Sequence, residues 1–412
     1  MLYTLAALLM GIESTPGTAA TLSAASDAML VEDPKYTSDM QKIERKFSKA
    51  DLSPFPFMIG RRLGQVTFKH EIRSNGLATG LTADAAKLAR LFRACGFALL
   101  PCSTTADRVS NVFGGANNAG AATWASGGTP NNTEPVMFDL TCTTGGNAAA
   151  AKFTVTPNNP DYGTASTNIA ASGAISLGTS GATITPTITT NLAIGDRFTV
   201  MVWPIGVKLV PVSEGFETAT IEVYYEGIKH KLTGAVGTFQ FTADAGGIVT
   251  AEFTFMGVHN DVVDAALPTG LVFEQKLPAL FQDALVTMGK DASLVIKQIS
   301  FNLSLQAGVR EDANAPLGFR GYTLQDRTPQ GGLQPEATTE GTHAFWGDYQ
   351  TGDQKAFFAR IGNTVGNTVS LFGPRVQTSS LGYSDSNNNR MYDVGMQFAR
   401  YAGNDEVMFH FG

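Results

Sequence analysis

The stretch from residue 220 to residue 256 constrains the fold of this chain most strongly. Apolar and polar residues alternate along it in short segments, and glycine-containing turns separate the segments. The predicted strands are residues 220–225, 228–233, 239–242 and 249–256. Because Ile221, Val223 and Tyr225 share one face of the first strand, the stretch predicts an antiparallel sheet with one buried face.

Charged residues are scarce in the chain. Asp, Glu, Lys and Arg make up 16% of the 412 residues, against about 25% in an average soluble domain. The 44 glycines and 18 prolines favour many turns between short strands. A net charge of −7 without a basic stripe argues against a protein that grips nucleic acid, because such proteins cluster Lys and Arg against phosphates.

Outside that stretch, alternation predicts strands over residues 66–73, 294–305, 362–374 and 393–411, and His70 lies on the apolar face of the first. Residues 82–95 predict one helix, with Thr82 as its N-cap and Gly96 after its end. Its apolar stripe, which predicts docking onto a sheet, consists of Leu88, Leu91, Phe92 and Cys95. The sequence therefore predicts a mainly β chain, an antiparallel β-sandwich with one packed α-helix.

Lysine and arginine become rare in residues 131–211, where Thr, Ala and Gly dominate. Alternating segments predict strands over 151–157, 182–190 and 196–203. We expect a small β-module inserted into a discontinuous domain formed by residues 1–130 and 212–412. One continuous domain with long loops is the alternative. The glycine-rich stretch 114–128 reads as a flexible loop.

The apolar start of the chain (MLYTLAALLMG) follows no basic residue and is shorter than a membrane span of about 20 residues. We expect an ordered N-terminal segment, with a secretory leader as the alternative. Residues 27–31 are compatible with a short strand, and the prolines and aromatic residues of 52–60 predict a structured loop.

Catalytic and metal-binding motifs are missing from the sequence. The five histidines share no ligand spacing, and the three cysteines match neither a disulfide framework nor a zinc site. Residues 385–389 (DSNNN) resemble the start of a calcium loop, but Arg390 stands where that loop needs glycine and Met396 where it needs glutamate. We expect a polar hairpin turn there and predict no enzyme activity, no metal and no cofactor. A catalytic constellation formed only in three dimensions is a third alternative.

Several short segments together resemble bacteriophage tail tube (major tail) proteins. In the first half these are 13–18 (ESTPGT), 43–45 (IER), 60–62 (GRR), 71–73 (EIR) with Gly76, and 91–97 (LFRACGF). In the second half they are 226–227 (EG), 232–238 (LTGAVGT), 253–257 (FTFMG), 326–329 (DRTP) with Gly331, and 405–407 (DEV). The order and spacing of these segments carry the resemblance, which covers most of the chain except about residues 105–215.

The resemblance implies a β-sandwich protomer that assembles into hexameric rings, whose inner strands close around a lumen. The rings would stack into a virion tail tube, assembled in the host cytoplasm, through which viral DNA passes without specific binding. The implied partners are further copies of this chain and the tape measure, tail terminator and baseplate or tip proteins, with no membrane partner. A surface or fibre module that binds a glycan or receptor is the alternative, favoured by the Thr- and Asn-rich middle region.

Two sets of candidate site residues follow. Residues 32–60 are expected to form a loop that contacts neighbouring subunits, with Arg45, Phe55, Phe57 and Met58 at the contact, because these apolar side chains would otherwise be exposed. The alternative is that they fold onto their own domain. The candidate lumen-lining residues are Glu222, Glu226 and Glu252, because Glu222 and Glu252 interrupt strands whose opposite faces are apolar. The acidic net charge of the chain would also repel the phosphates of passing DNA. An ordinary solvated sheet face explains these glutamates equally well.

Overall fold

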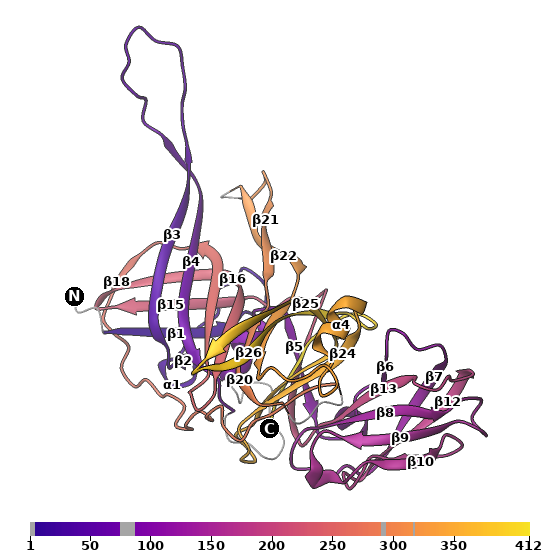
Figure 1. Cartoon of the computed structure of the whole chain (residues 1–412). Helices are drawn as coiled ribbons and strands as arrows, with labels where there is room; N and C mark the ends of the chain where they lie inside the picture. The colour runs from indigo at the N-terminus through magenta and orange to yellow at the C-terminus, as the bar shows by residue number, and fades with distance from the viewer. Residues whose placement is uncertain (1–4, 75–86, 290–293, 316–317) are drawn as a thin grey trace.

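The computed structural model describes residues 5–74, 87–289, 294–315 and 318–412. The chain is mainly β, as predicted, and most of its strands belong to one large antiparallel sheet (Figure 1). The buried core of this sheet is rich in phenylalanine. The strands of this sheet are β1 (Ala6–Ile12), β2 (Ala28–Met29), β3 (Glu32–Ile43), β4 (Met58–Glu71), β5 (Phe97–Cys102), β14 (Gly206–Pro211), β15 (Ala219–Tyr225), β16 (Gly227–Asp244), β17 (Thr250–His259), β18 (Val263–Ala265), β19 (Leu285–Met288), β20 (Ile296–Asn302), β23 (Gln330–Pro335), β24 (Gln354–Ile361), β25 (Val369–Ser386), β26 (Asn389–Ala399) and β27 (Met408–Phe411).

The described residues also form three smaller sheets, four short α-helices and one 3-10 helix, η1 (Pro160–Tyr162). A five-stranded sheet contains β6 (Phe113–Gly114), β8 (Val136–Thr144), β9 (Lys152–Pro157), β10 (Ser166–Ala170) and β13 (Arg197–Val202). A three-stranded sheet contains β7 (Ala121–Gly128), β11 (Ile175–Ser176) and β12 (Ala182–Thr190), and a hairpin contains β21 (Leu305–Glu311) and β22 (Phe319–Arg327). The α-helices are α1 (Ala24–Asp27), α2 (Lys87–Arg93), α3 (Thr105–Arg108) and α4 (Phe345–Thr351).

The predicted antiparallel strands between residues 220 and 256 are confirmed, with one difference. Two of the predicted strands are parts of a single strand, β16, which continues through a bulge at Gly234 instead of ending there. Gly234 has a φ of 59°, which glycine adopts without strain. The buried carboxylate of Glu13 accepts hydrogen bonds from the Gly234 backbone N–H (2.8 Å) and from the Thr218 and Thr220 hydroxyls. These bonds fix the bulge against the N-terminal segment.

Residues 32–60 form most of a long β-hairpin and not the predicted loop. β3 pairs with β4 over most of its length, and a bulge accommodates Asp33 and Pro34 near the start of β3. The prediction failed because β3 contains many charged residues and a proline, which do not look like a strand in the sequence. β3 tolerates them because its second edge has no described partner strand. The short strand considered for residues 27–31 is present only as β2, which is two residues long, because α1 ends at Asp27.

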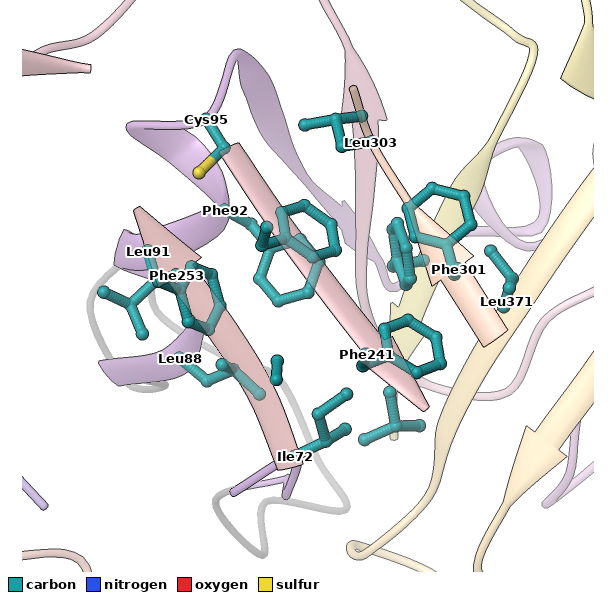
Figure 2. Packing of buried hydrophobic residues seen from close by; sticks show 14 of the residues in the cluster. Ile72, Leu88, Leu91, Phe92, Cys95, Phe241, Phe253, Phe301, Leu303 and Leu371 are labelled. Carbon is teal, nitrogen blue, oxygen red and sulfur yellow. The ribbon is translucent and has the colours of Figure 1, made fainter. Parts of the chain in front are cut away.

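The predicted helix is present from Lys87, and its predicted N-terminal residues Thr82 and Asp84 lie outside the described residues. Phe92 on α2 is completely buried and packs among the phenylalanines of the core, which include Phe253 and Phe301 (Figure 2). Its ring centroid lies 4.5 Å from that of Phe239 and 4.9 Å from that of Phe409. The other residues of the stripe, Leu88, Leu91 and Cys95, are also buried, as predicted. Phenylalanines from β16, β17, β20 and β27 thus form one core around the helix.

The later strands are confirmed in type but shifted in extent. The polar hairpin turn predicted at residues 385–389 joins β25 to β26, and Asn387 and Asn388 both have positive φ, as a two-residue hairpin turn requires. His70 is buried on the apolar face of β4, as expected.

The residues between β5 and β14 form the small sheets, which have their own buried core. Strand pairing differs from the expected limits of 131–211: β6 and β7 pair with β13 and β12 of the small sheets, so the expected loop 114–128 contains strands. β14 pairs instead with β5 and β27 of the large sheet. Cys102 lies opposite Gly206, so the chain leaves and re-enters the large sheet at neighbouring positions.

Phe113 and Trp203 pack against two phenylalanines of the large sheet, Phe358 and Phe372, which face this module. We call residues 103–205 the inserted module from here on. Whether it behaves as a separate domain stays a prediction.

Candidate assembly surfaces

The β3–β4 hairpin projects far beyond the large sheet and ends in a tip formed by residues 44–57 (Figure 1). Leu52 at this tip is fully exposed. The other exposed apolar side chains of the tip and the adjoining strand ends are Ile43, Phe47, Phe55, Phe57, Met58 and Ile59. All four predicted contact residues, Arg45, Phe55, Phe57 and Met58, lie here and are exposed, so they do not fold back onto their own sheet.

Basic side chains surround the rings of the tip. The Arg45 guanidinium lies 5.3 Å from the ring centroid of Phe47 and 5.9 Å from that of Phe55. The Lys49 ammonium lies 4.7 Å from the Phe55 ring centroid, and the Lys42 ammonium 5.3 Å from that of Phe57. Such cation–π contacts strengthen when water is removed from them. The tip therefore presents a basic aromatic surface suited to burial against another molecule.

The base of the hairpin is anchored by Tyr36 of β3. Its hydroxyl is hydrogen-bonded to Nδ1 of His259, and its ring stacks on that of His230 at 4.4 Å between centroids. The Tyr225 hydroxyl accepts a hydrogen bond from the Tyr36 backbone N–H and donates one to the Pro34 carbonyl. Burial raises the pKa of Tyr36 to about 12 and lowers the pKa of both histidines. The tip is thus carried on a rigid base.

A second surface is the polar face of the large sheet, opposite the core. Directly paired residues form one row across nine strands, and directly paired side chains lie on the same face. In order from β3 to β24, the row is Glu32, Lys69, Glu252, Gln240, Asn302, Gln330, Gln397, Gln377 and Gln354. We call this set the amide row, because six of its members are Asn or Gln.

Hydrogen bonds link neighbours within the amide row. Gln240 donates to the Glu252 carboxylate at 3.1 Å, and Asn302 donates to the Gln240 carbonyl at 3.4 Å. A shallow groove runs beside them and is also lined by Thr242 and Ser300. The amide row therefore forms one continuous polar face with few charges across nine strands of the large sheet.

The three candidate glutamates have different surroundings. Glu252 is half-buried in the amide row, and Glu226 is exposed in the turn between β15 and β16. Glu222 is only 7% exposed, and its carboxylate lies 3.4 Å from the Lys229 ammonium and 3.5 Å from that of Lys231. Glu222 is therefore not the solvated acid that its position in the sequence indicates. The cause is that residues on the neighbouring strand pair with it.

Among the described residues, no three His, Cys, Asp or Glu side chains come together in a way that could hold a metal ion. The three cysteines are buried as free thiols, and burial raises the pKa of Cys102 to about 11. Of the five histidines, His230 and His259 come together at Tyr36. Among the described helices, none has the length and apolar character to span a membrane.

Comparison with known proteins gives no relative: no protein-family model matches the chain, and neither does any curated protein.

Sequence reasoning missed Phe47, the anchor around Tyr36 and the amide row. The row had a signal in the sequence, because Gln240, Gln330 and Gln397 each occupy the polar phase of a strand. Their alignment depends on the register between strands far apart in the chain, which alternation within one strand does not reveal.

Proposed function

We propose that this chain is a self-assembling structural subunit of a bacteriophage tail tube, located in the virion tail. Its large sheet is then the tail-tube-type β-sandwich implied by the sequence resemblance. The chain carries out no catalysis in this role. Copies of it form rings, and the rings stack into a tube that conducts viral DNA and ends at tape measure, terminator and baseplate or tip proteins.

The hairpin tip is the observation that carries this proposal. Six of its apolar side chains are between 41% and 60% exposed, and Leu52 is fully exposed. A soluble monomer gains nothing from holding these side chains on a projecting arm, whereas an arm that inserts into a neighbouring copy buries them. The rigid base at Tyr36 supports the same interpretation, because an ordered arm loses less conformational entropy on docking.

The amide row supports the assignment of the lumen face. A wall of Gln and Asn side chains holds water but offers phosphates no cluster of cations. Lys69 is the single basic member of the row and is flanked on both sides by Glu32 and Glu252. DNA would therefore pass along this face without being retained, which refines the expectation of an acidic wall toward a nearly neutral one.

Electron microscopy of the purified protein at high concentration tests the proposal. Rings or hollow tubes about 10 nm wide, an order-of-magnitude width for a ring of domains of this size, are the expected result. Uniform monomers at every concentration would contradict it. Binding to a glycan array without any assembly would favour the surface-module alternative.

A further inference from the structure

The large sheet contains the same arrangement of strands twice. In the first unit the strands are hydrogen-bonded in the order β1-β15-β16-β17-β4-β3. In the second unit the order is β19-β24-β25-β26-β23-β20. The six strands follow one another along the chain in the same sequence in both units, and all pairings are antiparallel. Counted along the chain, each unit also carries a projecting hairpin between its second and third strands (Figure 1). A helix follows the third strand in both units, α2 after β4 and α4 after β23.

The dimensions of the two units agree as well. β16 and β25 are both 18 residues long. Each long strand has a bulge six residues before its last pair with the next strand, where Val236 faces Met256 and Ser380 faces Gly395. The agreement extends from topology to register.

Packing under the helices repeats in the same way. Three residues before the last pair, Phe239 faces Phe253 in the first unit. At the same place in the second unit, Tyr383 faces Tyr392. The α2 ring of Phe92 contacts both phenylalanines, and α4 contacts both tyrosines through its first two aromatic residues. The chain is therefore an internal duplication of one unit.

The two units are joined edge to edge. β20, the second strand of the second unit, pairs with residues 240–244 of β16 in the first. The equivalent edges at the two ends of the duplication have no such partner among the described strands: β3 pairs only with β4, and residues 378–386 of β25 pair only with β26. One end therefore presents a donor edge and the other end the matching acceptor edge.

Side chains at the two equivalent edges differ in exposure, as expected if one edge is covered and the other is not. Phe239 is 1% exposed, and the ring of Phe301, supplied by β20, lies 5.7 Å from it. Tyr383, at the equivalent position of β25, is 55% exposed. In the first unit, β20 covers the end of β16. No described strand covers the equivalent end of β25 in the second unit.

We propose that β3 of one copy pairs antiparallel with the end of β25 of a second copy, which repeats between molecules the junction of β20 with β16. The closure of these contacts into a ring rests on the proposed tube function. A head-to-tail contact of this kind closes into a ring when its rotation permits. A ring of six units then contains three chains, in place of the six chains expected from the sequence resemblance.

The duplication also fixes the register of this contact. Pairing with the third strands places Thr37 opposite Gln65, as Ser300 lies opposite Gly332, so residues 35–39 of β3 correspond to residues 298–302 of β20. Asn302 faces Gln240 within the chain. The equivalent pair between two copies is Asp39 with Ser384, and the pairing extends to Thr37 with Ser386, where β25 ends before the turn of Asn387 and Asn388.

Disulfide cross-linking tests both the contact and the number of chains. The double variant Asp39→Cys with Ser384→Cys should give covalent dimers and trimers on a non-reducing gel after oxidation, because directly opposed strand residues lie within disulfide reach. The matched control, Asp39→Cys with Asp385→Cys, places the second thiol on the opposite face of β25 and should give at least tenfold less product. The native cysteines are buried and do not interfere.

The outcomes separate this inference from the proposed function. A ladder that ends at the trimer, together with a native mass of three chains per ring for the unmodified protein, supports it. If the double variant Asp39→Cys with Ser384→Cys forms tubes but gives no cross-linked product, the edge pairing is overturned. Rings of six chains would overturn it as well, and both results leave the tube function standing. A chain that never assembles contradicts both.

Discussion

Replacement of Phe57 by serine at the hairpin tip should weaken assembly without affecting the fold. Phe57 is 52% exposed, which for a phenylalanine of roughly 200 Å² leaves about 100 Å² to be buried in a neighbouring copy. At about 25 cal/mol per Å² this burial contributes about 2.5 kcal/mol per contact. Phe57→Ser should therefore raise the protein concentration needed for tube formation on the order of 50-fold. Sedimentation of tubes over a concentration series measures this directly.

The matched control for this prediction is Ile194→Ser. Ile194 is 76% exposed on the inserted module, so the substitution removes a similar apolar surface away from the hairpin. It should leave the critical concentration unchanged, and both variants should unfold within about 0.5 kcal/mol of the unmodified protein. Equal assembly of Phe57→Ser and the unmodified protein would refute the reasoning, and so would an equal loss in the control.

Three further predictions concern stability and the module. Burial lowers the pKa of His70 to about 4 and that of His410 to about 3. Below about pH 6.5 these histidines therefore bind protons in the unfolded chain but not in the folded chain. The free energy of unfolding, measured in urea, should have its full value above that pH and be lower by up to about 4 kcal/mol at pH 5. Glu222→Lys should cost about 3 kcal/mol, because it places a third cation beside two lysines. Glu252→Lys on the half-buried polar face, directly opposite Lys69, should cost only about 1 kcal/mol in thermal denaturation. Replacing residues 103–205 by Asn-Gly, with the two module-facing phenylalanines changed to threonine, should leave tubes visible by electron microscopy, because β5 and β14 already pair as a hairpin.

Each of these has a result that would contradict it. A free energy of unfolding that stays constant from pH 7.5 to pH 5 would mean that the two histidines are protonated in the folded chain. Equal destabilisation by the two glutamate variants would remove the distinction between a buried, paired carboxylate and a wall residue. Loss of tubes in a folded variant without the module would show that the module takes part in the contacts between subunits.

Much of the local structure was predictable because it depends on neighbouring residues. Alternation along residues 220–256 predicted strands, and β17 has the expected single buried face, whereas β15 is buried on both faces over residues 219–223. The apolar stripe through Phe92 predicted the side of α2 that packs on the core. β3 was missed because its pattern is that of an edge strand, in which charge and proline are tolerated. The exposed tip was predictable for a related reason: aromatic residues between prolines fit no sheet interior.

The duplication was not predictable from the sequence. β16 and β25 share length, bulge and partner strands, yet one packs phenylalanine and the other tyrosine at the equivalent position, and the inserted module interrupts only the first unit. Equivalent backbones accept different side chains as long as the burial pattern is kept. Both the duplication and the amide row depend on the pairing of strands that are far apart in the chain, and a single sequence does not reveal this pairing.

A three-dimensional reconstruction of the assembled particle by electron cryomicroscopy tests the account most directly. We predict a hollow tube in which the amide row from Lys69 to Gln377 lines the lumen and the hairpin tip around Phe57 is buried in a neighbouring copy. A particle whose amide row faces outward, with the tip still exposed to solvent, would contradict the account.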